Sequence, residues 1–171
     1  MSRDSSEAHA SRTPASNASV GETETVRSPL RRLLDALRNE PAPAGHAGDL
    51  LRDLLADPQV AIWPIAGTPD APGASGRLIV SPRLHEGVVV TSGLFRPAPG
   101  KAYQVWFLRG GQPQPNVLFS VDPSGVGAGI VRADAPWHDF DTVAVTPEPR
   151  GGSPAPTGPI VLAGSLVDAA S

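Results

Sequence analysis

Short apolar runs separated by glycine and proline fill the chain from Gln59 onward, and this pattern predicts β-strands. No helical periodicity interrupts the runs, and regularly spaced strands of this kind are typical of an antiparallel sandwich or barrel. We therefore predict an all-β fold, an antiparallel β-sandwich of about eight short strands. The predicted strands are 60–65, 77–80, 87–91, 102–108, 117–121, 127–131, 142–146 and 160–162.

The densest apolar and aromatic run, residues 101–108, predicts the central strand of this sheet. Side chains alternate across a strand. The set that should face the core is Tyr103, Val105 and Phe107, and the set that should lie under a loop or a neighbouring segment is Gln104, Trp106 and Leu108. Large groups on both sides are typical of a strand with both faces covered. Arg109, at the exit of the strand, is expected to be an ordinary surface residue.

A different pattern precedes the strands. Residues 1–28 offer almost nothing apolar to bury, which predicts a disordered tail. Ser28 and Pro29 are typical of a helix start, and leucines then recur at helical spacing on one side of residues 29–39: Leu30, Leu33, Leu34 and Leu37. A second short amphipathic helix is predicted from Asp49 to Leu55 or Ala56. Packing on the domain or weak self-association is the plain interpretation of both helices, and docking into a partner's groove is the alternative.

The predicted organisation thus has four parts: a disordered tail (1–28), short helices with a linker (29–56), the β-sandwich domain (57–166) and a C-terminal tail (167–171). The 20 prolines and 18 glycines among 171 residues fit short segments joined by turns. A net charge of −3 gives no indication of a nucleic-acid partner. The sequence has no signal segment and no apolar run of roughly 20 residues, so it predicts a soluble, cytoplasmic chain without a membrane span.

The chain contains no convergent set of chemically active residues. It has no cysteine, and its four histidines stand alone in the sequence, which argues against a metal site. Asp134, Asp139 and Asp141 do not have the spacing of a calcium loop, and Trp137 with Phe140 should anchor this inter-strand loop. No serine has the surroundings of a nucleophile. We expect no catalytic residue, no metal and no cofactor, and therefore no enzyme.

Two ordered motifs resemble the C-terminal domain of anti-sigma-K factors (the RskA type), over roughly residues 54–163. The first comprises Tyr103, Gln104, Trp106 and Phe119. The second comprises Thr146, Glu148, Pro149, Gly151, Gly152, Ser153, Pro156, Thr157 and Gly158. The resemblance implies an all-β module that is normally tethered to the plasma membrane on its extracytoplasmic side. It also implies regulation of sigma-factor-dependent transcription without catalysis. These signature residues are expected to be structural or to contact a partner.

The second motif also has a physical interpretation of its own. Its prolines fix φ and lack amide donors, so the segment cannot form a central strand. We expect a rigid, extended loop that crosses the end of the sandwich and returns as the strand at 160–162. Glu148 should accept backbone amides from the glycine turn at Gly151 and Gly152.

Two functions remain open from the sequence. The first is a non-enzymatic regulatory module that binds a protein, either a sigma factor or a cell-envelope protein. The second is a β-sandwich that binds a peptide or carbohydrate and has no anti-sigma activity.

Overall fold

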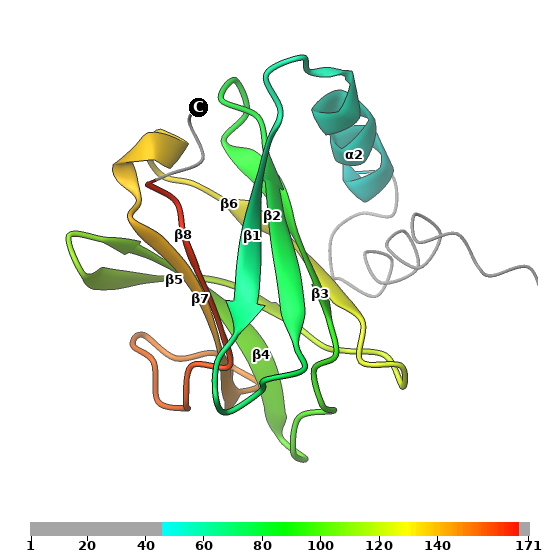
Figure 1. Ribbon diagram of the computed structural model, residues 1–171, viewed down its shortest axis with the longest axis vertical. Helices are drawn as coiled ribbons and strands as arrows, with labels where there is room; N and C mark the ends of the chain where they lie inside the picture. Colours follow the sequence, from blue (N-terminus) through cyan, green and yellow to red (C-terminus); the bar gives the residue numbers. More distant parts are fainter. Residues whose placement is uncertain (1–45, 168–171) are drawn as a thin grey trace, which may run out of the picture.

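The computed structural model describes residues 46–167, which form one helix, eight strands and one 3-10 turn (Figure 1). The helix is α2 (His46–Ala56), and the turn is η1 (Trp137–Asp139). The strands are β1 (Ala61–Gly67), β2 (Ser75–Val80), β3 (Glu86–Ser92), β4 (Lys101–Arg109), β5 (Gln112–Phe119), β6 (Gly127–Arg132), β7 (Thr142–Pro149) and β8 (Leu162–Ser165). No helix among these residues combines the length and apolar character needed to cross a membrane.

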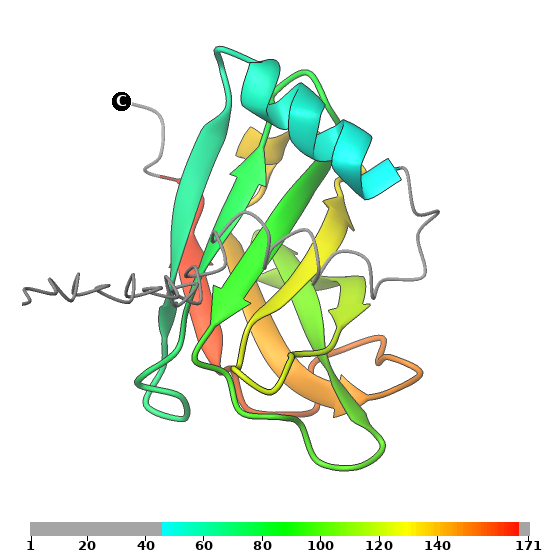
Figure 2. The ribbon, with the colours of Figure 1, turned by 90° about the vertical axis from the view of Figure 1, so that its right-hand side faces the viewer.

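All eight strands belong to one antiparallel sheet in the order β5-β4-β7-β8-β1-β2-β3-β6. The all-β class predicted from the sequence is confirmed. The two layers expected of a sandwich are parts of one continuous sheet, which curls until its end strands β5 and β6 approach each other (Figures 1 and 2). The curl encloses the main core, because every strand contributes its inward-facing residues to the same interior.

A side-chain amide bridges the seam between the two end strands. Asn116 on β5 donates from Nδ2 to the carbonyl oxygen of Arg132 (2.6 Å) and accepts from the Arg132 amide at Oδ1 (3.2 Å). The side chain thereby satisfies backbone groups that a paired strand would otherwise satisfy. Glycines on β6 permit the close approach, since a Cβ at Gly127 would lie 2.8 Å from the ring of Phe119. The sheet is therefore almost a closed barrel.

Strand positions agree with the sequence pattern, with shifted ends. β5 begins at Gln112, five residues before the predicted start, because Gly110 and Gly111 both have positive φ and make a tight hairpin turn directly after β4. Pro113 and Pro115 are tolerated because β5 is an end strand. β7 continues to Pro149 along β4, and β8 begins at Leu162, so the predicted strand at 160–162 is displaced towards the C-terminus.

Strand β4 has both faces covered, as predicted, but it lies next to the end strand β5 and not in the middle of the strand order. β4 pairs with β5 on one side and with β7 on the other. The inward residues Tyr103, Val105 and Phe107 join the main core, and Gln104 and Trp106 are buried on the opposite face.

Aromatic side chains close one end of the interior. Phe107 contacts Trp137 and Phe140 with ring centroids 5.5 and 5.3 Å apart, so the loop before β7 is anchored as expected. Arg109 is not an ordinary surface residue, because its guanidinium lies 4.7 Å from the Phe140 ring centroid and pairs with Asp134 at 3.0 Å. The prediction that Arg109 is an ordinary surface residue was therefore wrong.

The helix α2 covers part of the outer face of the sheet, where it lies across β2, β3 and β6 (Figure 2). Its leucines Leu50, Leu51 and Leu54 are buried, and they form a second, smaller apolar cluster with Val88 and Ile130. The helix predicted from Asp49 onward is confirmed, with an earlier start at His46. The predicted tail (1–28) and the helix at residues 29–39 lie outside the described residues, and the four domain boundaries stay predictions.

Candidate functional site

Most of the signature residues come together where β4, β7 and the loop after β7 meet. The register pairs Gln104 with Thr146 and Ala102 with Glu148. Because side chains alternate, Gln104, Trp106, Thr146 and Glu148 project on the same side of these neighbouring strands, away from the main core. The loop of residues 150–161, called the proline loop below, lies against this side.

A buried chain of hydrogen bonds begins at the indole. Trp106 is fully buried and donates from Nε1 to Thr146 Oγ1 at 2.8 Å. The Thr146 hydroxyl in turn donates a hydrogen bond to Glu148 Oε1 at 2.6 Å. One hydroxyl thus satisfies both a buried donor and a buried acceptor.

Glu148 is fully buried and receives five hydrogen bonds. Three come from hydroxyl groups, those of Thr146, Ser153 (2.8 Å) and Thr157. Two come from backbone amides, those of Thr157 (2.8 Å) and Gly158 (3.1 Å). A carboxylate with this many donors is held as an anion without a neighbouring cation.

Burial would raise the pKa of Glu148, but the opposing effect of its hydrogen bonds is larger. The Thr146 and Thr157 hydroxyls and the Thr157 and Gly158 amides together lower the pKa from 4.5 to about 2. Glu148 is therefore ionised throughout the neutral range, and its charge holds the proline loop in place.

The amide donors differ from those expected. The sequence predicted that Glu148 would accept amides from Gly151 and Gly152, but Thr157 and Gly158 provide them. The reason is that β7 runs on to Pro149, so the glycine turn lies beyond the carboxylate. This turn is closed by a hydrogen bond from the Gly152 amide to the Pro149 carbonyl oxygen (2.8 Å), and Gly152 has a φ of 77°.

A second attachment fixes the loop after the glycine turn. Gln104 donates from Nε2 to the Ser153 carbonyl oxygen (3.1 Å) and accepts from the Ser153 amide at Oε1 (2.9 Å). Both atoms of the buried amide are thereby satisfied by one loop residue.

At the far end of the loop, Gly158 allows close contact with β7. A Cβ at this position would lie 2.3 Å from the Pro147 carbonyl oxygen, which no side chain tolerates. We call the residues that fasten the loop the Glu148 clamp: Gln104, Trp106, Thr146, Glu148, Ser153, Thr157 and Gly158.

The other signature residues lie elsewhere. Tyr103 and Phe119 stack in the main core with ring centroids 5.7 Å apart. Tyr103 donates its hydroxyl proton to the Phe95 carbonyl oxygen at 2.8 Å, and burial raises the pKa of this hydroxyl. Three more signature residues are exposed and do not belong to the clamp: Pro149, Gly151 and Pro156.

The clamp has the chemistry of a structural device. Each oxygen of Glu148 already accepts at least two hydrogen bonds inside the protein. Such a carboxylate is a poor base and a poor metal ligand, because accepting a proton or a cation would require these bonds to break. The chemically available part of the region is the exposed surface of the loop.

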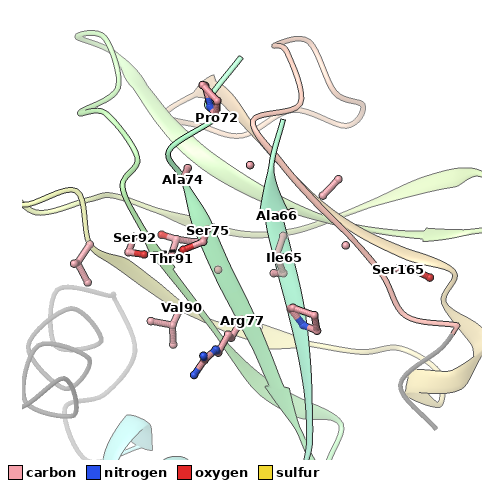
Figure 3. Close-up of a pocket in the computed structure, with 16 residues that line it drawn as sticks. Ile65, Ala66, Pro72, Ala74, Ser75, Arg77, Val90, Thr91, Ser92 and Ser165 are labelled. Carbon is pink, nitrogen blue, oxygen red and sulfur yellow. Dashed lines mark hydrogen bonds between the residues drawn. The ribbon is translucent and has the colours of Figure 1, made fainter. Parts of the chain in front are cut away.

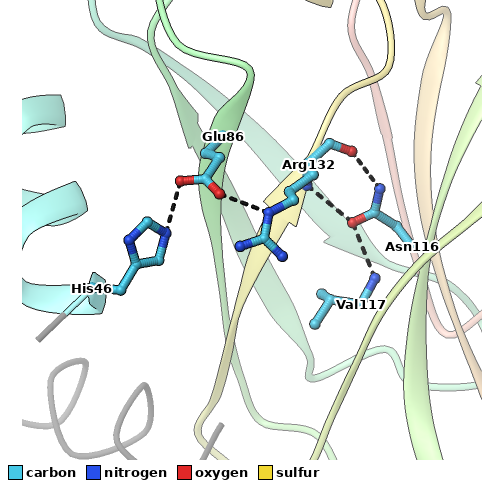
Figure 4. A network of polar contacts seen from close by, with 5 residues as sticks. All are labelled: His46, Glu86, Asn116, Val117 and Arg132. Carbon is cyan, nitrogen blue, oxygen red and sulfur yellow. Dashed lines mark hydrogen bonds and ion pairs between the residues drawn. The ribbon is translucent and has the colours of Figure 1, made fainter. Parts of the chain in front are cut away.

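Sequence reasoning missed a polar network that reaches from α2 across β3 and β6 to β5 (Figure 4). Glu86 pairs with His46 at 2.8 Å and with Arg132 at 2.6 Å, and Asn116 bonds the backbone of Arg132. The network ties α2, β3, β6 and β5 together. The order of these residues along the chain contains no signal for it, because pairing of β3 with β6 brings Glu86 opposite Arg132 only in the folded sheet.

Comparison with known proteins agrees with the resemblance found in the sequence. The family model described as "Anti-sigma-K factor rskA, C-terminal" matches residues 13–160. The chain is 28% identical over 103 residues to the "Anti-sigma-K factor RskA" of Mycobacterium sp. (strain KMS), covering 60% of the chain and 40% of that protein. It is 33% identical over 91 residues to the "Uncharacterized protein in phr 5'region" of Streptomyces griseus, covering 53% of the chain and 37% of that protein.

The chain therefore spans about two fifths of the length of these curated relatives. No solved structure matches it significantly. The family match extends over most of the chain and includes both signature motifs up to Ile160. On this evidence the chain belongs to the family of the anti-sigma-K factor RskA C-terminal domain.

Proposed function

We propose that this chain is a non-enzymatic regulatory module that binds a protein partner through the exposed surface of the proline loop. The observation that carries the proposal is the Glu148 clamp. A fully buried carboxylate and its five hydrogen bonds hold a surface loop that contributes little to the main core. A surface loop held this firmly is better explained by recognition of a partner protein than by packing of the core.

The loop is suited to binding because its shape is set before association. The clamp side chains hold residues 153, 157 and 158 from beneath, while Arg150, Pro154, Ala155 and Pro156 are exposed above them. A preorganised loop loses little conformational entropy when a partner binds, so more of the contact energy appears as affinity.

Family membership suggests the class of partner. Relatives of this chain are named as anti-sigma-K factors, and we propose a sigma factor from the same genome as the partner, with a cell-envelope protein as the other candidate. The amphipathic segment at residues 29–39 would supply a second contact and add avidity through effective concentration. The cytoplasmic location read from the sequence stays a prediction.

Co-purification tests the proposal. The full chain carrying an affinity tag should capture a sigma factor that is co-expressed from the same genome, and deletion of residues 29–39 should weaken this capture. The exposed-loop variant Ala155→Arg should weaken it independently. Recovery of cell-envelope proteins alone, unchanged by either alteration, would contradict a sigma-factor partner and leave a protein-binding module of another kind.

A further inference from the structure

A groove lies on the outer face of the sheet, beside α2. Sixteen residues from β1, β2, β3, β8 and nearby loops line it, and its volume is about 1020 Å³ (Figure 3). Its floor is built from side chains that point away from the main core: Pro64, Ala66, Ser75, Arg77, Val90 and Ser92. We call this feature the outer groove.

The outer groove continues the apolar surface that α2 covers. On β3, Val88 is buried under the leucines of α2, and the next outward residue, Val90, contacts the same cluster and also lines the groove. On β1, Ile62 faces outward two residues before Pro64 and is 54% exposed. An apolar surface that begins beneath one helix and continues uncovered beside it is typical of a binding site for a second segment.

The dimensions of the groove suit a polypeptide better than a small ligand. Small-molecule sites enclose about 300–1,000 Å³ and bury most of the ligand surface. The outer groove reaches the upper end of that range, yet Pro64, Ala66, Ser75 and Ser92 are exposed, so it is open along its length. A helix laid into it would bury one apolar side and leave the other in solvent.

We infer that the outer groove is the docking site of this chain's own amphipathic segment, residues 29–39. The segment carries Leu30, Leu33, Leu34 and Leu37 at helical spacing, with arginines on the other side. Such a short helix is only marginally stable in water unless its apolar side is covered.

The segment can reach the groove. Helix α2 begins at His46, which pairs with Glu86 at the start of β3. Val90 and Ser92 lie four and six residues further along the same strand, about 13 and 20 Å away at 3.3 Å per residue. Seven residue steps separate Asn39 from His46, and they span up to about 23–25 Å when extended.

The helix also matches the groove in length and position. Eleven helical residues extend for about 16 Å, and the four adjacent strands β3, β2, β1 and β8 are together about 14 Å wide at 4.8 Å per interval. The groove floor lies two to four residues along β3 from Val88, about 7–13 Å. Packed helices are separated by 8–10 Å, so the segment would lie beside α2 in direct contact with it.

The charges of the two helices also favour a position of residues 29–39 beside α2. The exposed charged residues of α2 are Asp49, Asp53 and Arg52, which pairs with Asp49 at 2.9 Å, so two carboxylates stand against one arginine. The polar side of the segment carries Arg31, Arg32 and Arg38 against the single Asp35. The two helices therefore present opposite net charges to each other.

Docking would regulate the proposed partner binding, a consequence that rests on the proposed function. A partner that takes up residues 29–39 must first displace them from the outer groove. The docking itself concerns the free chain and is tested without any partner.

Hydrogen exchange of the full chain in isolation provides the test. Amides in residues 30–38 should exchange at least about tenfold more slowly than in an unstructured chain. Ala66→Arg places a long charged side chain in the groove floor at an exposed position and should abolish this protection. Ala155→Arg, an equal change on the proline loop, should leave the protection intact.

The outcomes separate the alternatives. Protection that survives dilution and disappears only in the Ala66→Arg variant would support intramolecular docking. Protection that falls on dilution would show that a second copy occupies the groove, and would overturn the inference. Unprotected amides in the unaltered chain, or protection indifferent to Ala66→Arg, would overturn it as well. Loss of partner capture alone would contradict only the proposed function.

Discussion

Trp106 and Glu148 are joined through a single hydroxyl group: Thr146 Oγ1 accepts from the indole at 2.8 Å and donates to the carboxylate at 2.6 Å. Strands β4 and β7, against which the proline loop is fastened, are thereby parts of one buried network. The bond from Trp106 to Thr146 thus joins the two signature motifs across 40 positions of the sequence.

The charge of Glu148 should make stability depend on pH. Its pKa is about 2 in the folded protein and 4.5 when unperturbed. The stabilisation is therefore complete above pH 4.5 and is lost as the pH falls from 4.5 towards 2. The difference corresponds to roughly 3 kcal/mol. Urea unfolding measured across this range should show the decline for the unaltered chain.

Glu148→Gln should remove this dependence, because an amide does not titrate. The variant should also be less stable at pH 7 by roughly 2–3 kcal/mol, since its NH₂ group would face donors. Asp70→Asn, which removes an exposed carboxylate, serves as the control. A Glu148→Gln variant with the same acid-induced loss as the unaltered chain would contradict the assignment.

Two substitutions of Trp106 separate the contribution of ring packing to stability from that of the indole hydrogen bond. Trp106→Ala should destabilise the protein by about 3–5 kcal/mol, because the ring is fully buried. Trp106→Phe keeps most of the ring volume and loses the bond to Thr146, so its effect should be smaller, about 1–2 kcal/mol. Leu108→Ala, at a half-buried position on the same strand, provides a reference in the same unfolding experiment. A Trp106→Phe variant as stable as the unaltered chain would show that the hydrogen bond is unimportant, whereas equal effects of the two tryptophan variants would show that ring packing is.

The proline loop contains a matched pair of glycines. A Cβ at Gly158 would lie 2.3 Å from the Pro147 carbonyl oxygen, whereas a Cβ at Gly151 would have no heavy atom within 4 Å. Gly158→Ala should therefore lower stability by about 1–3 kcal/mol. Gly151→Ala should change it by no more than about 0.5 kcal/mol. Thermal unfolding compares the two, and similar midpoints would show that the loop is not held against β7.

At Arg132 the seam between the end strands is held by the side chain of Asn116. Asn116→Leu removes both bonds to the Arg132 backbone, so the Arg132 amide should exchange with solvent faster by at least about tenfold. Val90, in the middle of the same curled sheet, lies on β3 between two paired strands, and its amide should be unaffected. Unchanged exchange at Arg132 would mean that the seam is closed by other contacts.

The sequence revealed the strands because their signals are local. Alternation in residues 101–108 and glycine or proline at the run ends predicted β4 and its two faces correctly. The shifted start of β5 had no such local signal. The hairpin turn at Gly110 and Gly111 places the following prolines in a strand, which only an end strand tolerates, and strand order is a property of the whole sheet. Closure of the sheet through Asn116 had no local signal for the same reason.

The sequence indicated the residues of the Glu148 clamp but not which of them are hydrogen-bonded to one another. Prolines at 147, 149, 154, 156 and 159 indicated a rigid loop, and a glutamate among them indicated a bonded carboxylate. Which amides reach Glu148 depends on how far β7 extends, and that is set by its pairing with β4. The outer groove had no counterpart in the sequence, because its lining combines residues of four strands.

The most direct test of the central claim is the affinity of the full chain for the sigma factor from the same genome, measured by titration calorimetry. Ala155→Arg alters the exposed face of the proline loop and spares every residue of the Glu148 clamp, while Asp70→Arg alters another exposed loop. The account predicts measurable binding that weakens by at least about tenfold, or 1.4 kcal/mol, in the Ala155→Arg variant and stays unchanged in the Asp70→Arg variant. Equal affinity of all three proteins, or no binding by the unaltered chain, would contradict it.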